Sequence, residues 1–186
     1  MRTSTFDPCL LVTKDQDGPF GLVGMQTDDT LILGDQAFVE LEDSELKKAN
    51  LLAQPAEQLT EQTPLLFNGY KLSLEGDDIF LAQKGQGSRL STIDPSSLIY
   101  SQAYREQRAR GAYIGTICQP EAAFDLLVVA QAQDPGDDEI KALNKRLQWQ
   151  IKNQDHGLRY VPLELDSVKL FVFVDGSFAN NKDLSS

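Results

Sequence analysis

Two adjacent carboxylates, Asp28 and Asp29, stand between two short apolar runs, residues 20–25 and 30–34. Each run has the length of a strand, and the polar centre between them is typical of a hairpin turn. Successive side chains on a straight strand point to opposite faces, so a turn is needed to bring both carboxylates near one ion. Carboxylate oxygens are ligands that Mg²⁺ takes in proteins. The stretch therefore predicts a rigid cation site, although acidic residues are also common in turns that bind nothing.

This hairpin resembles the strand–turn–strand of reverse transcriptases, whose centre is Tyr-x-Asp-Asp. Gln26 stands here at the position of the usual Tyr, and residues 30–34 are similar to the apolar strand, ending in Gly, of copia-type retrotransposon polymerases. In those polymerases an Asp-Pro-Cys segment precedes the hairpin at about the distance of residues 7–9 here. The resemblance implies a polymerase palm in which Asp28 and Asp29 are catalytic and bind Mg²⁺ or Mn²⁺.

Later segments continue this resemblance in order. Residues 67–84 resemble the hairpin between the palm and the thumb of copia-type polymerases. Residues 107–126, which include an Arg-rich helix and a break at Pro120, resemble the thumb of the elements found in fungal genomes, and residues 143–150 continue the match. The shared order extends over nearly the full length. It implies an internal piece of a retrotransposon polyprotein whose parent activity is RNA-directed DNA synthesis.

Three arginines, Arg105, Arg108 and Arg110, fall on the helix predicted for the thumb-like segment. In a polymerase the thumb holds the RNA/DNA template–primer duplex, so the resemblance implies that these arginines bind nucleic acid. Arg105 and Arg108 can share a helix face, whereas Arg108 and Arg110 diverge by about 200° at 3.6 residues per turn. Solvated arginines with buried stems are an equally common explanation of such residues.

An apolar strand is predicted over residues 168–174, and it leads into Asp175 and a turn of small residues. This end resembles the first strand of a ribonuclease H domain, which implies that Asp175 is a metal ligand. On sequence grounds alone, an Asp at the end of a strand is more often a turn residue. In the family, a third palm aspartate and the fingers lie upstream, and further ribonuclease H ligands lie downstream. We therefore expect the chain alone to be catalytically inactive.

Composition and charge limit the classes of function. The 186 residues are 41% hydrophobic and carry a net charge of −11, which opposes binding to a phosphate backbone. Residues 1–100 have a net charge of −9 and residues 101–186 a net charge of −2, so a nucleic-acid surface is expected in the second half. The sequence predicts no membrane span and no signal peptide. Cys9 and Cys118 fit no metal or disulfide pattern. We expect an intracellular protein, with cytoplasm and nucleus not distinguished.

The predicted fold class is α+β. An antiparallel palm-type sheet is covered by a helix over residues 35–50, whose N-cap is Asp35, and is followed by a helical thumb or connection and a terminal strand. The predicted division is 1–92 for the partial palm, 93–155 for the helices and 156–186 for the start of ribonuclease H. A second acidic pair, Asp77 and Asp78, is expected in a Gly turn between exposed edge strands and to bind no metal.

Three further predictions concern individual elements. The apolar runs within residues 7–34 predict a meander of three antiparallel strands. Asp94-Pro95 predicts the start of a helix, with Asp as the N-cap and Pro at the first helical position. The helix predicted after residues 134–136 has one apolar stripe, formed by Ile140, Leu143, Leu147 and Ile151.

The sequence is compatible with two alternatives to an inactive polymerase piece. The chain could be a retained binding module that pairs with polymerase segments or with nucleic acid, because a severed sheet exposes strand edges that invite pairing. It could also be a relic without function.

Overall fold

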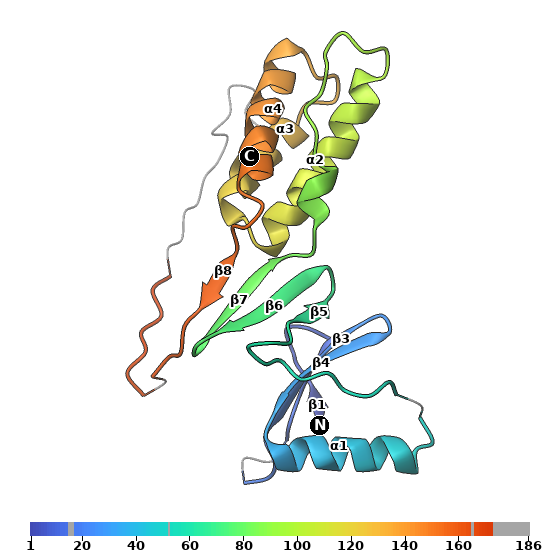
Figure 1. Ribbon diagram of the computed structural model, residues 1–186, viewed down its shortest axis with the longest axis vertical. Helices are drawn as coiled ribbons and strands as arrows, with labels where there is room; N and C mark the ends of the chain where they lie inside the picture. Colours follow the sequence, from blue (N-terminus) through green and yellow to red (C-terminus); the bar gives the residue numbers. More distant parts are fainter. Residues whose placement is uncertain (15–16, 52, 165, 173–186) are drawn as a thin grey trace.

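The computed structural model describes residues 1–14, 17–51, 53–164 and 166–172. Its strands are β1 (Arg2–Thr3), β2 (Leu10–Val12), β3 (Gly21–Gln26), β4 (Asp29–Gly34), β5 (Leu65–Phe67), β6 (Tyr70–Glu75), β7 (Asp78–Gln83) and β8 (Leu158–Tyr160). Its helices are α1 (Gln36–Lys48), α2 (Tyr100–Ile117), α3 (Ala123–Ala130) and α4 (Asp137–Lys152), with short 3-10 turns η1 (Gln86–Arg89) and η2 (Pro120–Ala122). The molecule is elongated, with α2, α3 and α4 at one end and α1 at the other (Figure 1).

The strands form two antiparallel sheets. The first sheet has the order β1-β2-β3-β4 and the second the order β5-β6-β7-β8. The predicted meander of three strands is confirmed as β2, β3 and β4, with β1 added at its edge. Two antiparallel sheets, with helices in separate segments of the chain, confirm the predicted α+β fold class. Within the described residues, no helix is both long enough and apolar enough to cross a membrane.

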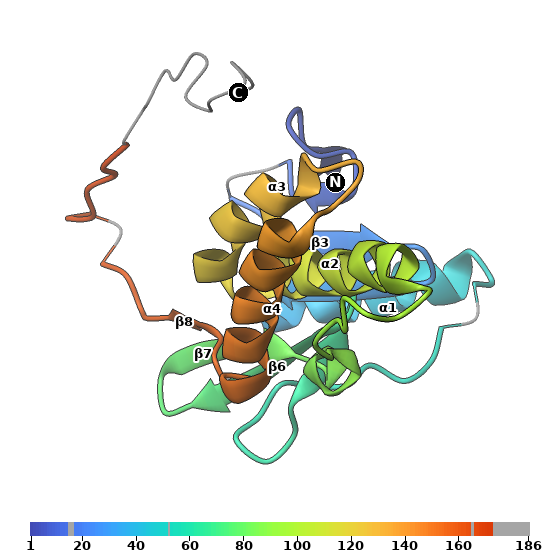
Figure 2. The ribbon, with the colours of Figure 1, turned by 90° about the horizontal axis from the view of Figure 1, so that it is seen from above.

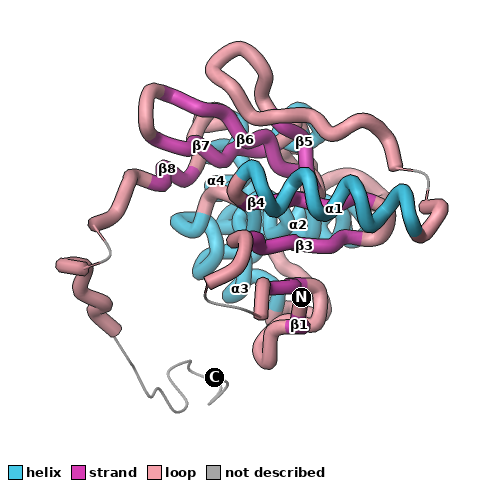
Figure 3. Tube along the Cα trace, turned by 90° about the horizontal axis from the view of Figure 1, so that it is seen from below, coloured by secondary structure: helices cyan, strands magenta, loops and turns pink. Residues whose placement is uncertain are grey.

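Asp35 joins the first sheet to its covering helix. As predicted, it is the N-cap of α1: one carboxylate oxygen accepts from the backbone N–H of Phe38 at 2.7 Å, and the other accepts from Phe20 at 2.8 Å. The bond from Phe20, and then the bond from Phe38, hold the pKa of Asp35 below its usual range. The Phe38 ring is buried against Gly34, where a Cβ atom would come within 2.7 Å of it. Viewed from below, α1 runs beside β3 and in front of β4 (Figure 3).

The second sheet connects the two ends of the molecule. The hairpin of β6 and β7 is confirmed, but these are inner strands, so the predicted exposed edge position is wrong. β8 pairs with β7 in the register Leu81↔Leu158 and covers that edge. The chain therefore leaves the second sheet after β7, builds the helices, and returns to the same sheet through β8.

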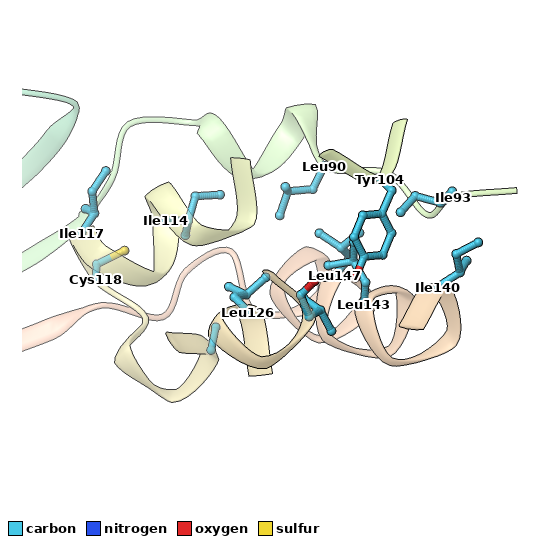
Figure 4. Close-up of a cluster of buried hydrophobic side chains, with 12 residues drawn as sticks. Leu90, Ile93, Tyr104, Ile114, Ile117, Cys118, Leu126, Ile140, Leu143 and Leu147 are labelled. Carbon is cyan, nitrogen blue, oxygen red and sulfur yellow. Dashed lines mark hydrogen bonds between the residues drawn. The ribbon is translucent and has the colours of Figure 1, made fainter. Parts of the chain in front are cut away.

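The largest hydrophobic core lies between α2, α3 and α4 (Figures 2 and 4). The predicted stripe of α4 is confirmed, because Ile140, Leu143 and Leu147 are buried there. In the first sheet and α1, by contrast, the buried hydrophobic side chains among the described residues are Val23 and Phe38. Most of the apolar burial, and so most of the hydrophobic stabilisation, belongs to the helical end.

Two predicted boundaries are wrong. The helix expected from Asp94-Pro95 begins at Tyr100 instead, because the Asp94 carboxylate accepts from the backbone N–H of Ser96 at 2.9 Å and closes a separate turn. The terminal strand expected over 168–174 is not found in its described part, residues 168–172, where Leu170 is 89% exposed. An apolar run forms a strand only where a neighbour accepts its backbone hydrogen bonds.

We predict that Leu143→Ala lowers the free energy of unfolding by about 2–5 kcal/mol, the usual cost of a fully buried leucine. Leu143 is 0% exposed in the same core as Cys118, whose thiol is 1% exposed and whose pKa is raised by burial. Denaturant titration measures the loss. Labelling of Cys118 by a thiol reagent should accelerate in parallel, while labelling of the exposed Cys9 should not change. Equal labelling rates for Cys118 in the variant and the parent would contradict this core.

Candidate cation site and nucleic-acid face

Asp28 and Asp29 lie at the tip of the β3–β4 hairpin. Gln26 pairs with Asp29 as the last rung of the ladder, so Thr27 and Asp28 form a two-residue turn and Asp29 is already the first residue of β4. Thr27 has a φ of 50°, a left-handed conformation that is rare for a β-branched residue. The sequence predicted the hairpin correctly, but the structure places only one of the two carboxylates within the turn.

The two carboxylates are exposed and have no hydrogen-bond or ion-pair partner in the described part of the chain. No group of three or more His, Cys, Asp or Glu side chains among the described residues is arranged to hold a metal. Asp175, the third predicted ligand, lies outside the described residues. Two exposed carboxylates fit only part of the ligand set that Mg²⁺ or Mn²⁺ needs for tight binding. The hairpin can therefore attract a cation, but full coordination requires further ligands.

The second acidic hairpin has the same geometry and a different environment. Gly76, with a φ of 63°, and Asp77 form its two-residue turn. Asp78 then begins β7, as Asp29 begins β4. Here Arg159 on β8 donates to Asp78 at 3.1 Å and to Glu75 at 2.6 Å, and these hydrogen bonds raise the pKa of Arg159. This arginine pairs with two of the three carboxylates of the second hairpin and leaves Asp77 without a partner in the described part of the chain. The sequence gives no sign of this pairing, because Arg159 is 81 residues from Asp78.

The three predicted nucleic-acid-binding arginines of α2 differ in the contacts they make. Arg108 donates from Nη1 to the carbonyl of Ala130 at 3.1 Å, at the end of α3. Arg110 donates to the carbonyl of Arg89 at 2.7 Å and forms an ion pair with Glu106 on its own helix. Both guanidinium groups thus serve contacts within the protein.

Arg105 is exposed and has no hydrogen-bond or ion-pair partner within the described residues. It lies with Arg108 beside an open hollow of about 380 Å³. The hollow is lined by Tyr104, Arg105, Arg108, Ala130, Ala132 and Gln133. The hydroxyl of Tyr104 donates to the carbonyl of Val129 at 2.7 Å, and burial raises the pKa of this tyrosine. As predicted, Arg105 and Arg108 lie on the same face of α2. Of the two, Arg105 is the one without a hydrogen-bond partner in the described part of the chain.

Comparisons with known proteins identify no relative: no family model, no curated protein and no solved structure matches the chain.

We predict that Mn²⁺ binds weakly at the β3–β4 tip and not at the β6–β7 tip. The first tip carries two carboxylates without a partner, whereas Arg159 pairs with Glu75 and Asp78 at the second tip and leaves only Asp77 available. In NMR spectra of the protein, low Mn²⁺ should broaden the backbone amide signals of residues 27–29 before those of residues 76–78. Arg159→Gln frees Glu75 and Asp78, so it should shift the broadening of residues 76–78 to lower Mn²⁺ concentration. Earlier broadening at residues 76–78 in the parent protein would contradict this reading of the charges.

Proposed function

We propose that this chain is part of a copia-type reverse transcriptase, comprising the back of the palm, the thumb and the start of ribonuclease H. The observation that carries the proposal is the β3–β4 hairpin, which presents Asp28 and Asp29 at its tip and is followed at once by a helix packed on the sheet. The order of elements after it, a second hairpin and then three helices, agrees with the order that the sequence resemblance implies.

The parent reaction is RNA-directed DNA synthesis, and the chain alone does not carry it out. Phosphoryl transfer by two metal ions needs cations held on both the attacking and the leaving oxygen. Asp28 and Asp29 are exposed and stand without a third carboxylate among the described residues. They require a carboxylate supplied by another polymerase segment before they can organise this chemistry.

A primer-extension assay tests this proposal, with an RNA template, a DNA primer and Mg²⁺ or Mn²⁺. We expect no nucleotide incorporation by the chain alone. Incorporation should appear when a copia-type segment containing the fingers and the first palm aspartate is added. Asp28→Asn should abolish the restored activity, whereas Asp77→Asn, a matched change at the other hairpin tip, should leave it unchanged.

Two results would refute parts of this proposal. Incorporation by the chain alone that is lost in Asp28→Asn would show that the isolated chain is an active polymerase. A restored activity that Asp28→Asn does not reduce would remove the hairpin from the catalytic site.

A second candidate is a module that pairs with other polymerase segments through a strand edge. The observation that favours it is β4, an edge strand of the first sheet that carries Leu31, Ile32 and the 62%-exposed Leu33. Such an edge offers unpaired backbone groups and apolar side chains to an incoming strand.

We expect Leu33→Lys to reduce co-purification of the chain with an intact copia-type polymerase, because a charge on an edge strand opposes pairing. Leu66→Lys on β5, another exposed leucine on a strand, serves as the matched control. Equal co-purification of the Leu33 variant and the parent chain would exclude β4 as the pairing edge.

A further inference from the structure

The outer face of α4 carries a row of lysines around a tryptophan. Lys141, Lys145, Trp149 and Lys152 lie within about 80° of one another around the helix axis, at 3.6 residues per turn. This face is opposite the buried stripe of Ile140, Leu143 and Leu147 that packs in the helical core. The orientation of α4 is set by that packing, so Lys141, Lys145 and Lys152 are exposed to solvent. Trp149, at the border of this face, is half-buried and packs against the core with part of its side chain. We call these four residues the α4 face.

The α4 face is basic in an acidic protein. The three acidic residues of α4 lie in its first turn, and the rest of the helix contains four Lys or Arg residues and no Asp or Glu, while the whole chain has a net charge of −11. Lys145 and Lys152 are exposed and have no ion-pair partner in the described part of the chain. Lys141 is 3.8 Å from Asp138, and both of these side chains are largely exposed. Most of the positive charge on this face is therefore available to an anionic partner.

Trp149 is held in place beside these lysines. The guanidinium of Arg146 lies 5.0 Å from the centre of the indole ring, and the imidazole of His156 meets the ring edge-on at 5.5 Å. Arg146 is fixed in turn by Asp125 of α3, which accepts from its Nε at 2.7 Å. Aromatic and guanidinium planes next to lysines are the combination with which proteins bind nucleic-acid strands.

We propose that the α4 face binds the sugar–phosphate backbone of nucleic acid, with Lys145 and Lys152 on phosphates and Trp149 beside a base or sugar. This inference rests on the proposed function and names a surface for it other than α2. The lysines of the α4 face are better placed to bind phosphates than Arg108 and Arg110 of α2, because these two arginines already donate to carbonyls of the protein.

Trp149 is the only tryptophan in the chain, so its fluorescence reports on this face directly. The test is a titration of the full chain with a short RNA–DNA duplex at low salt, followed by Trp149 emission and by fluorescence anisotropy of a dye on the duplex. We expect the emission to change over the same concentration range as the anisotropy. Binding at the α2 hollow alone would raise the anisotropy and leave the emission unchanged.

The matched variants are Lys145→Gln/Lys152→Gln and the control Lys71→Gln/Lys84→Gln, which removes the same charge from exposed lysines on β6 and directly after β7. Loss of two phosphate contacts should lower the slope of log affinity against log salt by about 1.8, at about 0.9 per contact as in duplex DNA. The control should retain the slope of the parent protein. Circular dichroism checks that both variants keep the helical content of the parent.

The outcomes separate this inference from the proposed function. Duplex binding with unchanged Trp149 emission, or with equal slopes for both variants, would overturn the α4 face and leave the polymerase proposal standing. Absence of binding at low salt would count against both. Sedimentation without nucleic acid tests another partner, an acidic surface of a second copy of the chain. A salt-sensitive dimer that dissociates only in Lys145→Gln/Lys152→Gln, and that the duplex does not disrupt, would show that the α4 face binds this surface. The inference would then be wrong.

Discussion

Burial of apolar side chains between α2, α3 and α4 is the interaction on which the rest of this structure depends. Leu143 and Leu147 are fully buried at the centre of this core. The first sheet buries much less, chiefly through Val23 and Phe38, and relies on the Asp35 carboxylate to hold α1 and β3 together. The hairpin that carries the acidic pair is thus held by a sheet and helix with few buried apolar side chains. The basic face of α4 is held by the much larger core between the helices.

Amide side chains fix the path of the chain between the second sheet and the helical end. Gln83, at the end of β7, accepts from the backbone N–H of Gly87 at 2.5 Å and donates to the carbonyl of Gln154 at 3.2 Å. Asn144 on α4 makes two bonds to the backbone of Ile93, at 2.7 and 2.8 Å. These side chains satisfy backbone groups that would be costly to bury unpaired. They fix the direction in which the chain leaves the sheet and therefore the orientation of α4.

The two acidic hairpins show how a distant residue changes the chemistry of one local motif. Both have a two-residue turn whose first residue has a positive φ, and both begin the next strand with Asp. Only the second is next to Arg159, which the return of the chain through β8 brings to Asp78 and Glu75. Both carboxylates at the tip of the first hairpin have no partner among the described residues, whereas Asp77 is the one such carboxylate at the second.

Features that depend on neighbours in sequence were predictable from the residues: both hairpins, the cap at Asp35 and the buried stripe of α4. These depend on periodicity, turn composition and capping, which act over a few residues. The inner position of β6 and β7, the internal contacts of Arg108 and the pairing of Arg159 were not predictable in this way. Each depends on a partner that only the folded chain brings close, such as Ala130 for Arg108 or Asp78 for Arg159. Residue types and spacing therefore located the acidic hairpins, and long-range packing determined which of their carboxylates remain free.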